Sequence, residues 1–277
     1  MPLRIVQSKQ NARLKELRRA LASPPRESAR EARGLAGVEG PKLIEEALRA
    51  GLKVDCVFVA EGFEHLVETL PLAPETEVLL LPRKLLDSAL TTETPQPIAA
   101  LVQPPDWTWA HLLGAQGKTA PLVVVLAGLQ DPGNLGTILR SAEAFGATSV
   151  LSLPGTVSAW NPKAVRASAG SVFRVPLLAA SAADCFARLR EAGVKIWTTA
   201  VRGAEAADRI DLAAPAALLI GNEGNGVPPD LAAQADGAIT IPCPGPVESL
   251  NASVAASVLL YEASRQRTNS KPKRSAR

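Results

Sequence analysis

The sequence predicts an α/β protein whose C-terminal half contains an open, largely parallel sheet. Uninterrupted aliphatic runs at residues 122–127 and 217–220 are typical of strands buried on both faces. Segments with apolar residues at helical spacing alternate with these runs and with shorter strand-like runs. Such alternation is the pattern of α/β folds, in which helices cover a parallel sheet.

The N-terminal third predicts a smaller α/β module. Ser8 is expected to cap a helix that presents leucines on one face and cations on the others and that ends before two prolines at 24–25. Helices and strands then alternate up to residue 102. Further helices are expected at 41–50, 63–70 and 83–88, and strands at 54–60, 77–81 and 98–102.

Residues 103–120 are predicted to form a linker, because they contain prolines and scattered glycines without a sustained period. Trp107 and Trp109 are expected to pin this linker to a domain surface; stacking on nucleic-acid bases is the alternative.

The C-terminal half predicts regular alternation of strands and helices from residue 121 onward. Its last helix is apolar or small on nearly every side, which is typical of a helix buried between two bodies. Leu250, Val254, Val258 and Tyr261 recur there at helical spacing. Strands are expected at 122–127, 150–153, 172–175, 195–200, 217–220 and 239–241, and helices at 134–145, 164–170, 182–192 and 248–262.

Composition excludes several classes of protein. The three cysteines are widely spaced and only two histidines accompany them, which argues against a disulfide framework and against a metal site. No apolar run approaches the ~20 residues of a membrane span, and no signal-peptide pattern is present. We therefore expect a cytoplasmic protein with no metal and no membrane partner.

Charge is distributed unevenly along the chain. The net charge is +3, but residues 1–33 carry +6 and residues 265–277 carry another +6, so the segment between them carries −9. Basic ends on an acidic body suggest a polyanionic partner, with ordinary solvated charge as the alternative. The basic tail at 265–277 is predicted to be disordered. Candidate phosphate contacts on the first helix are Arg13, Lys15, Arg18 and Arg19.

Three polar loops each follow a predicted strand, at the edge where open α/β sheets bind ligands. They contain no GxGxxG, no lysine after the glycine-rich GNEGNG and no GxSxG, which excludes dinucleotide, P-loop and serine-hydrolase sites. For Ser249 and Asn251, helix capping is the alternative to a role in a site. The loops carry Asn134 and Arg140, then Gly221 and Glu223, then Ser249 and Asn251.

In order and internal spacing these loops resemble the three motifs of the SpoU (TrmH) family of RNA ribose 2′-O-methyltransferases. The resemblance covers residues 121–262, and residues 8–102 also resemble the L30e-like substrate-binding module that precedes the catalytic domain in many members. The motifs read Asn134-x-Gly136-x-x-x-Arg140-x-Ala142, Gly221-Asn222-Glu223-Gly224-x-Gly226, and Ile241-Pro242 followed by Ser249-Leu250-Asn251-x-Ser253, with Ser168-Ala169-Gly170 between the first two.

The resemblance implies a SPOUT-type parallel sheet with a C-terminal trefoil knot, preceded by a small L30e-like α/β domain. The implied organisation is an RNA-binding domain at 1–102, a linker at 103–120, a catalytic domain at 121–264 and a basic tail at 265–277. It also implies a homodimer and S-adenosylmethionine bound in the knot. The residues expected to enclose this cofactor are Thr199, Ala200, Gly221, Ile241, Pro242 and Leu250.

The implied reaction is methylation of a ribose 2′-hydroxyl in structured RNA. Ribosomal RNA is favoured because the added N-terminal module suits a large target, and transfer RNA is the alternative. The sulfonium methyl is already electrophilic, so no metal is required. Arg140 would act on the hydroxyl. A charged guanidinium has no acceptor, so Arg140 is either an unusually deprotonated base or a clamp on the RNA phosphate.

The other site residues have supporting roles in this reading. Asn134 and Glu223 would orient Arg140 and the substrate, while Ser249 and Asn251 would shape the ribose and cofactor site. The alternative function is a non-catalytic RNA-binding or ribosome-assembly protein on the same fold. Intact polar residues in all three motifs favour the enzyme.

Overall fold

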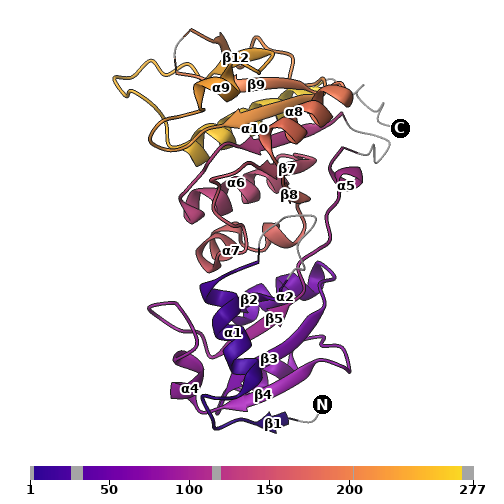
Figure 1. Cartoon of the computed structure of the whole chain (residues 1–277), viewed down its shortest axis with the longest axis vertical. Helices are drawn as coiled ribbons and strands as arrows, with labels where there is room; N and C mark the ends of the chain where they lie inside the picture. Colours follow the sequence, from indigo (N-terminus) through magenta and orange to yellow (C-terminus); the bar gives the residue numbers. More distant parts are fainter. Residues whose placement is uncertain (1–2, 26–33, 114–119, 202, 270–277) are drawn as a thin grey trace, which may run out of the picture. The chain divides into compact units, whose positions relative to one another are not determined.

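The computed structural model describes residues 3–25, 34–113, 120–201 and 203–269 (Figure 1). Two compact units make up the chain. The N-terminal unit consists of Met1–Asp106 together with Ser158–Arg174, and the C-terminal unit consists of Trp107–Val157 together with Val175–Arg277.

The N-terminal unit contains, within its described residues, a five-stranded sheet of order β1-β4-β3-β5-β2. The predicted strands at 54–60, 77–81 and 98–102 are confirmed as β3, β4 and β5. β1, β4 and β3 run parallel, whereas β5 is antiparallel to both of its neighbours. The bounds are β1 Leu3–Ile5, β2 Ala36–Glu39, β3 Val54–Ala60, β4 Glu77–Leu81, β5 Ile98–Val102, α1 Ala12–Ala22, α2 Pro41–Arg49, α3 His65–Glu68, α4 Arg83–Asp87, α7 Pro162–Ser168 and the 3₁₀ helix η1 Ser171–Phe173.

Helix α1 packs its leucine face on this sheet. Leu14 and Leu17 are fully buried in a cluster that includes Phe58 of β3. The helix is capped by Asn11, whose side chain accepts the Leu14 N–H, so the expectation of a cap at Ser8 is wrong. The Ser8 hydroxyl instead accepts the N–H of Gln10 in the preceding turn.

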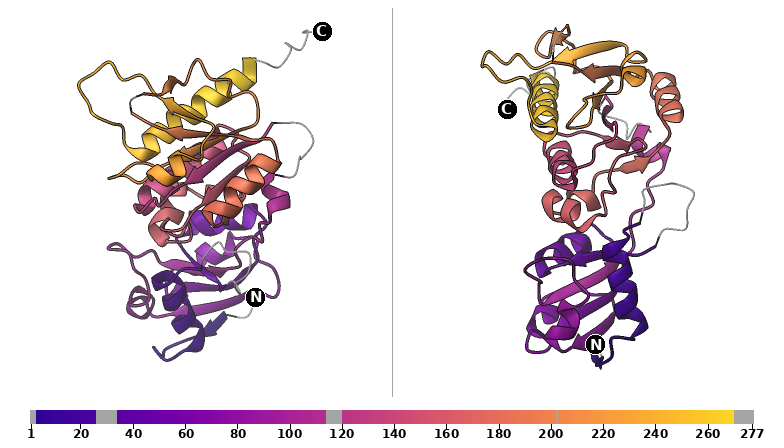
Figure 2. Two further views of the ribbon diagram at one scale, coloured as in Figure 1. Left: turned by 45° about the horizontal axis from the view of Figure 1, so that its top comes forward. Right: turned by 60° about the vertical axis from the view of Figure 1, so that its left-hand side comes forward.

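The C-terminal unit contains, within its described residues, a seven-stranded sheet of order β10-β12-β9-β11-β6-β7-β8 in which the pairings are parallel. β6 and β11 lie side by side at its centre, which explains their aliphatic composition. Helices α8 and α10 cover opposite faces (Figure 2). The bounds are β6 Leu122–Leu126, β7 Ser149–Ser152, β8 Leu177–Ala179, β9 Lys195–Thr199, β10 Glu205–Ala206, β11 Ala216–Ile220, β12 Gly237–Thr240, α5 Trp109–Leu113, α6 Pro132–Ala144, α8 Ala182–Glu191, α9 Pro229–Ala232 and α10 Ala252–Asn269.

Part of the predicted linker belongs to this second unit. Trp107 and Trp109 pack against its core, and the Arg188 guanidinium lies 5.0 Å from the Trp109 ring centroid. Surface pinning of the two tryptophans is thereby confirmed. Residues 114–119 lie outside the described residues.

The strand expected at 172–175 is wrong. Those residues fall in and after η1, and the strand, β8, begins only after Pro176. Ala169 and Gly170 have φ angles of +49° and +92°, and two successive left-handed residues turn the chain between α7 and η1. A local apolar pattern does not reveal such a turn.

The last helix is displaced from its predicted position at 248–262, because α10 begins at Ala252 and continues to Asn269. The prediction of disorder from residue 265 is therefore wrong for 265–269, and residues 270–277 lie outside the described part of the chain. Arg267 explains the extension, since its guanidinium donates to the carbonyls of Leu212, Pro121 and Ala214 at 2.9 Å each.

One side of α10 is buried within the chain and the other is open. Ala256, Leu259 and Leu260 are buried, whereas Val258 and Tyr261 are exposed. Within the described residues no helix has both the length and the apolarity needed to cross a membrane.

Candidate active site

The carboxyl ends of β6 and β11 bring the first two polar loops together around the carboxylate of Glu223. Its oxygens accept the N–H groups of Gln130 at 3.3 Å and Asp131 at 3.2 Å. Asn134 adds its side-chain amide at 3.0 Å. Adjacent parallel strands place their following loops at one edge, so residues 89 positions apart in the chain meet.

The first loop is shaped by the start of α6. Helix α6 begins at Pro132 rather than at the expected Asn134, because the Asp131 side chain caps it by accepting the Asn134 N–H at 2.7 Å. An aspartate followed by proline at the first helical position is a helix-start signal that points to Asp131 in the sequence.

The second loop is held by Asn222. Its side-chain amide donates to the Gly128 carbonyl at 2.9 Å, and its side-chain oxygen accepts the Gly224 N–H at 2.8 Å. Gly221 permits this fold of the loop, since a Cβ there would lie 2.1 Å from the Gly226 carbonyl carbon. Asn222 stands in the second motif, but its contact with the first loop depends on tertiary structure.

The third loop joins the other two through Asn251. Its amide donates to the Asn134 side-chain oxygen at 3.1 Å. Its own oxygen accepts the Ser253 N–H at 2.8 Å and the Ser253 hydroxyl at 2.7 Å, capping α10. Helix capping and the bridge to Asn134 therefore coexist in one side chain. The result is a hydrogen-bonded chain, Glu223–Asn134–Asn251, across all three motifs.

Glu223 is held in its ionised form. Burial works to raise its pKa, but hydrogen bonds from Asn134 and from backbone N–H groups, including those of Asp131 and Gln130, outweigh this effect and the pKa is lowered. Because the folded pKa is depressed, the associated stability is present above the unfolded pKa and is lost as the pH falls through the folded pKa.

Arg140 lies on α6, exposed, and within the described residues its side chain has no hydrogen bond or ion pair. It is therefore available to a group outside the chain. Ser249 is also exposed and unpaired among the described residues, in the loop that precedes α10. The structure does not bring Ser249 into the hydrogen-bonded chain of the other motif residues.

The residues expected to hold the cofactor follow adjacent strands. The Ala200 N–H, just after β9, donates to Ile239 of β12 at 3.0 Å, and the Thr199 hydroxyl donates to the Leu219 carbonyl of β11 at 3.0 Å. Gly221 follows β11 directly. Ile241, Pro242 and Leu250 lie in the segment between β12 and α10.

These residues fit the uncharged adenosine part of S-adenosylmethionine. The strand ends offer backbone groups and small side chains rather than a cluster of charges. On β9, buried polar atoms of Trp197 and Thr198 have no hydrogen-bond partner among the described residues. The described residues contain no group of three or more His, Cys, Asp or Glu placed to hold a metal ion.

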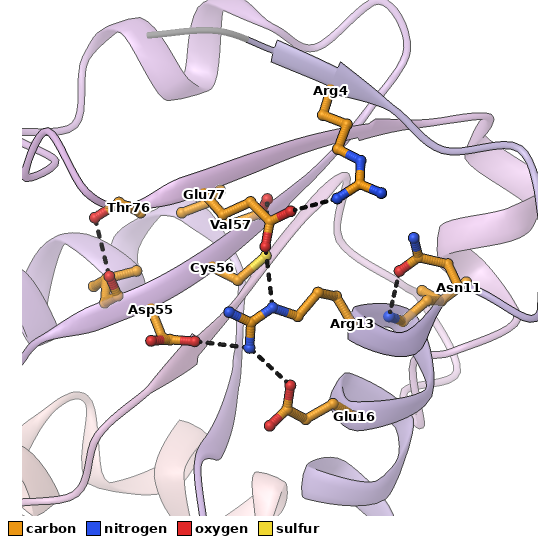
Figure 3. Close-up of polar contacts among 11 residues, drawn as sticks. Arg4, Asn11, Arg13, Glu16, Asp55, Cys56, Val57, Thr76 and Glu77 are labelled. Carbon is orange, nitrogen blue, oxygen red and sulfur yellow. Dashed lines mark hydrogen bonds and ion pairs between the residues drawn. The ribbon is translucent and has the colours of Figure 1, made fainter.

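The four basic residues of α1 that were predicted to contact phosphate differ in their ion pairs. Arg13 pairs with Glu16 and Asp55 at 2.9 Å each and with Glu77 at 3.0 Å (Figure 3). Its pKa is raised, above all by the hydrogen bond to Glu16. Lys15, Arg18 and Arg19 have no ion pair within the described residues.

Two family models match the chain. The model of the SpoU rRNA Methylase family matches residues 121–261, and that of the MRM3-like substrate binding domain matches residues 11–100. The 23S rRNA (guanosine(2553)-2′-O)-methyltransferase RlmP of Bacillus subtilis is 34% identical over 226 residues, which is 81% of this chain and 86% of that protein.

Solved structures resemble the chain over nearly its whole length. The SpoU methyltransferase AviRb of Streptomyces viridochromogenes, in complex with AdoMet, is 27% identical with a TM-score of 0.78, covering 95% of this chain and 100% of that one. The AdoMet-bound rRNA methyltransferase of Sinorhizobium meliloti is 29% identical with a TM-score of 0.79, covering 95% and 98%.

Proposed function

The chain belongs to the SpoU rRNA methylase family, and from this we propose that it transfers a methyl group from S-adenosylmethionine to a ribose 2′-hydroxyl of ribosomal RNA. One observation carries the proposal: the Glu223–Asn134–Asn251 chain joins the three motif loops, which follow β6, β11 and β12 of one parallel sheet. Such a substrate puts the reaction in the cytoplasm. The trefoil knot implied by the resemblance belongs to the same proposal.

Each residue contributes positioning or charge. S-adenosylmethionine, when bound, supplies an electrophilic methyl group. Asn134 is fixed by Glu223 on one side and Asn251 on the other, so its orientation is determined before substrate arrives. Arg140 acts on the 2′-hydroxyl, as a base assisted by the RNA phosphate or as a clamp on that phosphate. Ser249 and Leu250 flank the ribose and cofactor site.

The test uses purified protein, isotopically labelled S-adenosylmethionine, and ribosomal and transfer RNA from cells lacking the gene. We expect label in ribosomal RNA, at a ribose 2′-oxygen, as read by mapping of alkali-resistant linkages. Calorimetric titration distinguishes the alternative, because a non-catalytic RNA-binding protein has no need to bind the cofactor. Failure of the full chain to bind S-adenosylmethionine would contradict the proposal.

We propose that the N-terminal unit binds the RNA substrate, with phosphate contacts from Lys15, Arg18 and Arg19. Arg13 is set apart from these residues, since its guanidinium is occupied by three carboxylates of its own unit. The division at 1–102, 103–120 and 121–264 remains the proposed functional organisation. Ser158–Arg174, however, packs with the N-terminal unit despite its place in the sequence.

Reversing the charge of Lys15, Arg18 and Arg19 together is expected to flatten the logarithmic salt dependence of RNA binding by up to ~2–3 units, roughly one per lost phosphate contact. Fluorescence-anisotropy titrations at several salt concentrations measure this slope. Arg13→Gln is the matched control and should leave the slope near wild type. An unchanged slope in the triple variant would mean that these cations only solvate the helix.

A further inference from the structure

The segment Ser158–Arg174 belongs to the catalytic module by sequence and to the N-terminal unit by its contacts. It lies inside the stretch matched by the SpoU family model, yet it packs with the N-terminal unit. The chain consequently passes between the units after Asp106, after Val157 and after Arg174. The second and third of these crossings bracket one short segment.

Both ends of the segment are tied to the N-terminal unit. The Arg174 guanidinium pairs with Glu46 of α2 at 2.7 Å, and the Ser158 hydroxyl donates to the Pro25 carbonyl at 2.8 Å. Gly170 lies so close to α2 that a Cβ would be 2.9 Å from the Cβ of Glu46. The pKa of Glu46 is lowered, chiefly by its hydrogen bond from Arg174, so the carboxylate is charged when it holds the segment.

The residues just before the segment hold the first polar loop, Gly128–Asp131, which is called the catalytic loop below. The Thr156 hydroxyl accepts the Gly128 N–H at 3.1 Å and donates to the Leu126 carbonyl at 3.0 Å. The Val157 N–H donates to the Leu129 carbonyl at 2.8 Å. Leu129 is followed by the two residues whose N–H groups bind the Glu223 carboxylate.

We propose that Arg174 and Glu46 are positioning residues for methyl transfer, which fasten Ser158–Arg174 to the substrate-binding unit. Val157 is hydrogen-bonded to the catalytic loop and is joined to Ser158 by a peptide bond. The position of the segment therefore determines the position of the loop that anchors Glu223. RNA held by the N-terminal unit would thereby set the geometry of the reacting residues. The inference rests on the proposed function and adds to it a route from RNA capture to the catalytic loop.

The test compares Glu46→Gln, Arg174→Gln and the double variant in the full chain, by single-turnover methylation at saturating RNA and cofactor. Each single substitution is expected to lower the rate about 10-fold, because displacement of a positioned group is costly to the chemical step. Affinities for RNA and S-adenosylmethionine should stay within about 2-fold of wild type, since neither residue contacts a ligand in this scheme. The double variant should be no slower than the slower single variant.

Two further variants sharpen the comparison. Arg49→Gln is the matched control: Arg49 also pairs with Glu46, at 3.2 Å, and with Glu45, but both pairs lie within α2. Its rate should equal that of wild type, while Arg174→Lys should restore most of the rate. If Arg174→Gln does not fold, Ser158→Ala replaces it in the test, and its methylation rate is expected to fall about 3-fold.

Rates near wild type in both single variants, or equal losses in Arg49→Gln, would overturn the inference. So would losses in the two single variants that multiply in the double variant, because independent sites behave in that way. Methylation by the wild-type protein tests the proposed function itself, whereas the ratio of variant to wild-type rates tests this inference.

Discussion

Replacing Arg140 with alanine is expected to lower the rate of methyl transfer at least ~100-fold, the usual scale for a group that transfers a proton or stabilises charge. Folding and cofactor binding should stay near wild type. The side chain is exposed on α6 and unpaired among the described residues, so its removal breaks no internal contact seen there. Single-turnover methylation, thermal unfolding and calorimetric titration with S-adenosylmethionine provide the three readouts.

Arg140→Lys distinguishes the two roles left open for this residue. A phosphate clamp should keep partial activity in the lysine variant, because an ammonium still pairs with phosphate. The base hypothesis makes no simple prediction for lysine. Arg209→Ala, which removes another exposed arginine of the same unit, is the control and should be fully active. Activity of Arg140→Ala within a few-fold of wild type would exclude Arg140 as a catalytic residue.

The second large effect is expected at the open face of α10, where we propose that the homodimer forms. Val254, Val258 and Tyr261 are 46%, 39% and 55% exposed, and Tyr261 packs edge-on against Phe145 at 5.7 Å. Such a concentration of exposed apolar side chains marks an interaction surface. With α6 they form an apolar hollow of about 350 Å³, lined by Thr137, Phe145, Ser253, Val254, Ser257, Val258 and Tyr261.

A second copy of the chain is the economical occupant, because a two-fold axis lets the same patch cover itself. Light scattering at micromolar concentration should then give about twice the 29.0 kDa chain mass. Val258→Asp should weaken the dimer at least ~100-fold, since burying an unpaired carboxylate costs about 3 kcal/mol or more. Scattering over a concentration series measures the shift to monomer.

Methylation should be lost together with the dimer. Arg140 stands three residues after Thr137 on α6, and residues at that spacing are neighbours on a helix surface. A second subunit that covers the hollow would therefore lie beside Arg140, the proposed catalytic residue. Thr268→Asp places the same charge on an exposed position of α10 away from the hollow and should remain dimeric and active. A monomeric wild-type protein, or an active monomeric variant, would contradict this proposal.

The sequence by itself predicted most of the local elements and the polar residues that meet at the strand ends. The aliphatic runs that became β6 and β11 identified the centre of the sheet, because a strand buried on both faces needs apolar residues at every position. The order of the polar loops identified Asn134, Glu223 and Asn251. Their meeting was predictable because the carboxyl ends of parallel strands share one edge.

Tertiary structure alone decided which of these residues have internal partners. Arg13 and Lys15 are both basic and lie on one helix. Arg13, however, donates a hydrogen bond to Glu77, which lies 64 positions away in the sequence. Asn251 both caps α10 and binds Asn134, a combination that helix-capping rules do not contain. Periodicity and propensity report on neighbours in the chain, whereas ion pairs and hydrogen bonds depend on distances set by the whole fold.

The same reason explains two further features that the order of the sequence does not show. Helix α10 extends past its local pattern because the Arg267 guanidinium donates to carbonyl groups of residues that are distant in the sequence. Segment Ser158–Arg174 contains a motif of the SpoU family. Its contacts with Glu46 and Pro25 nevertheless place it in the N-terminal unit. Sequence order assigns such a segment to its neighbours in the chain, and only the packing of Gly170 and Arg174 against α2 assigns it to its neighbours in space.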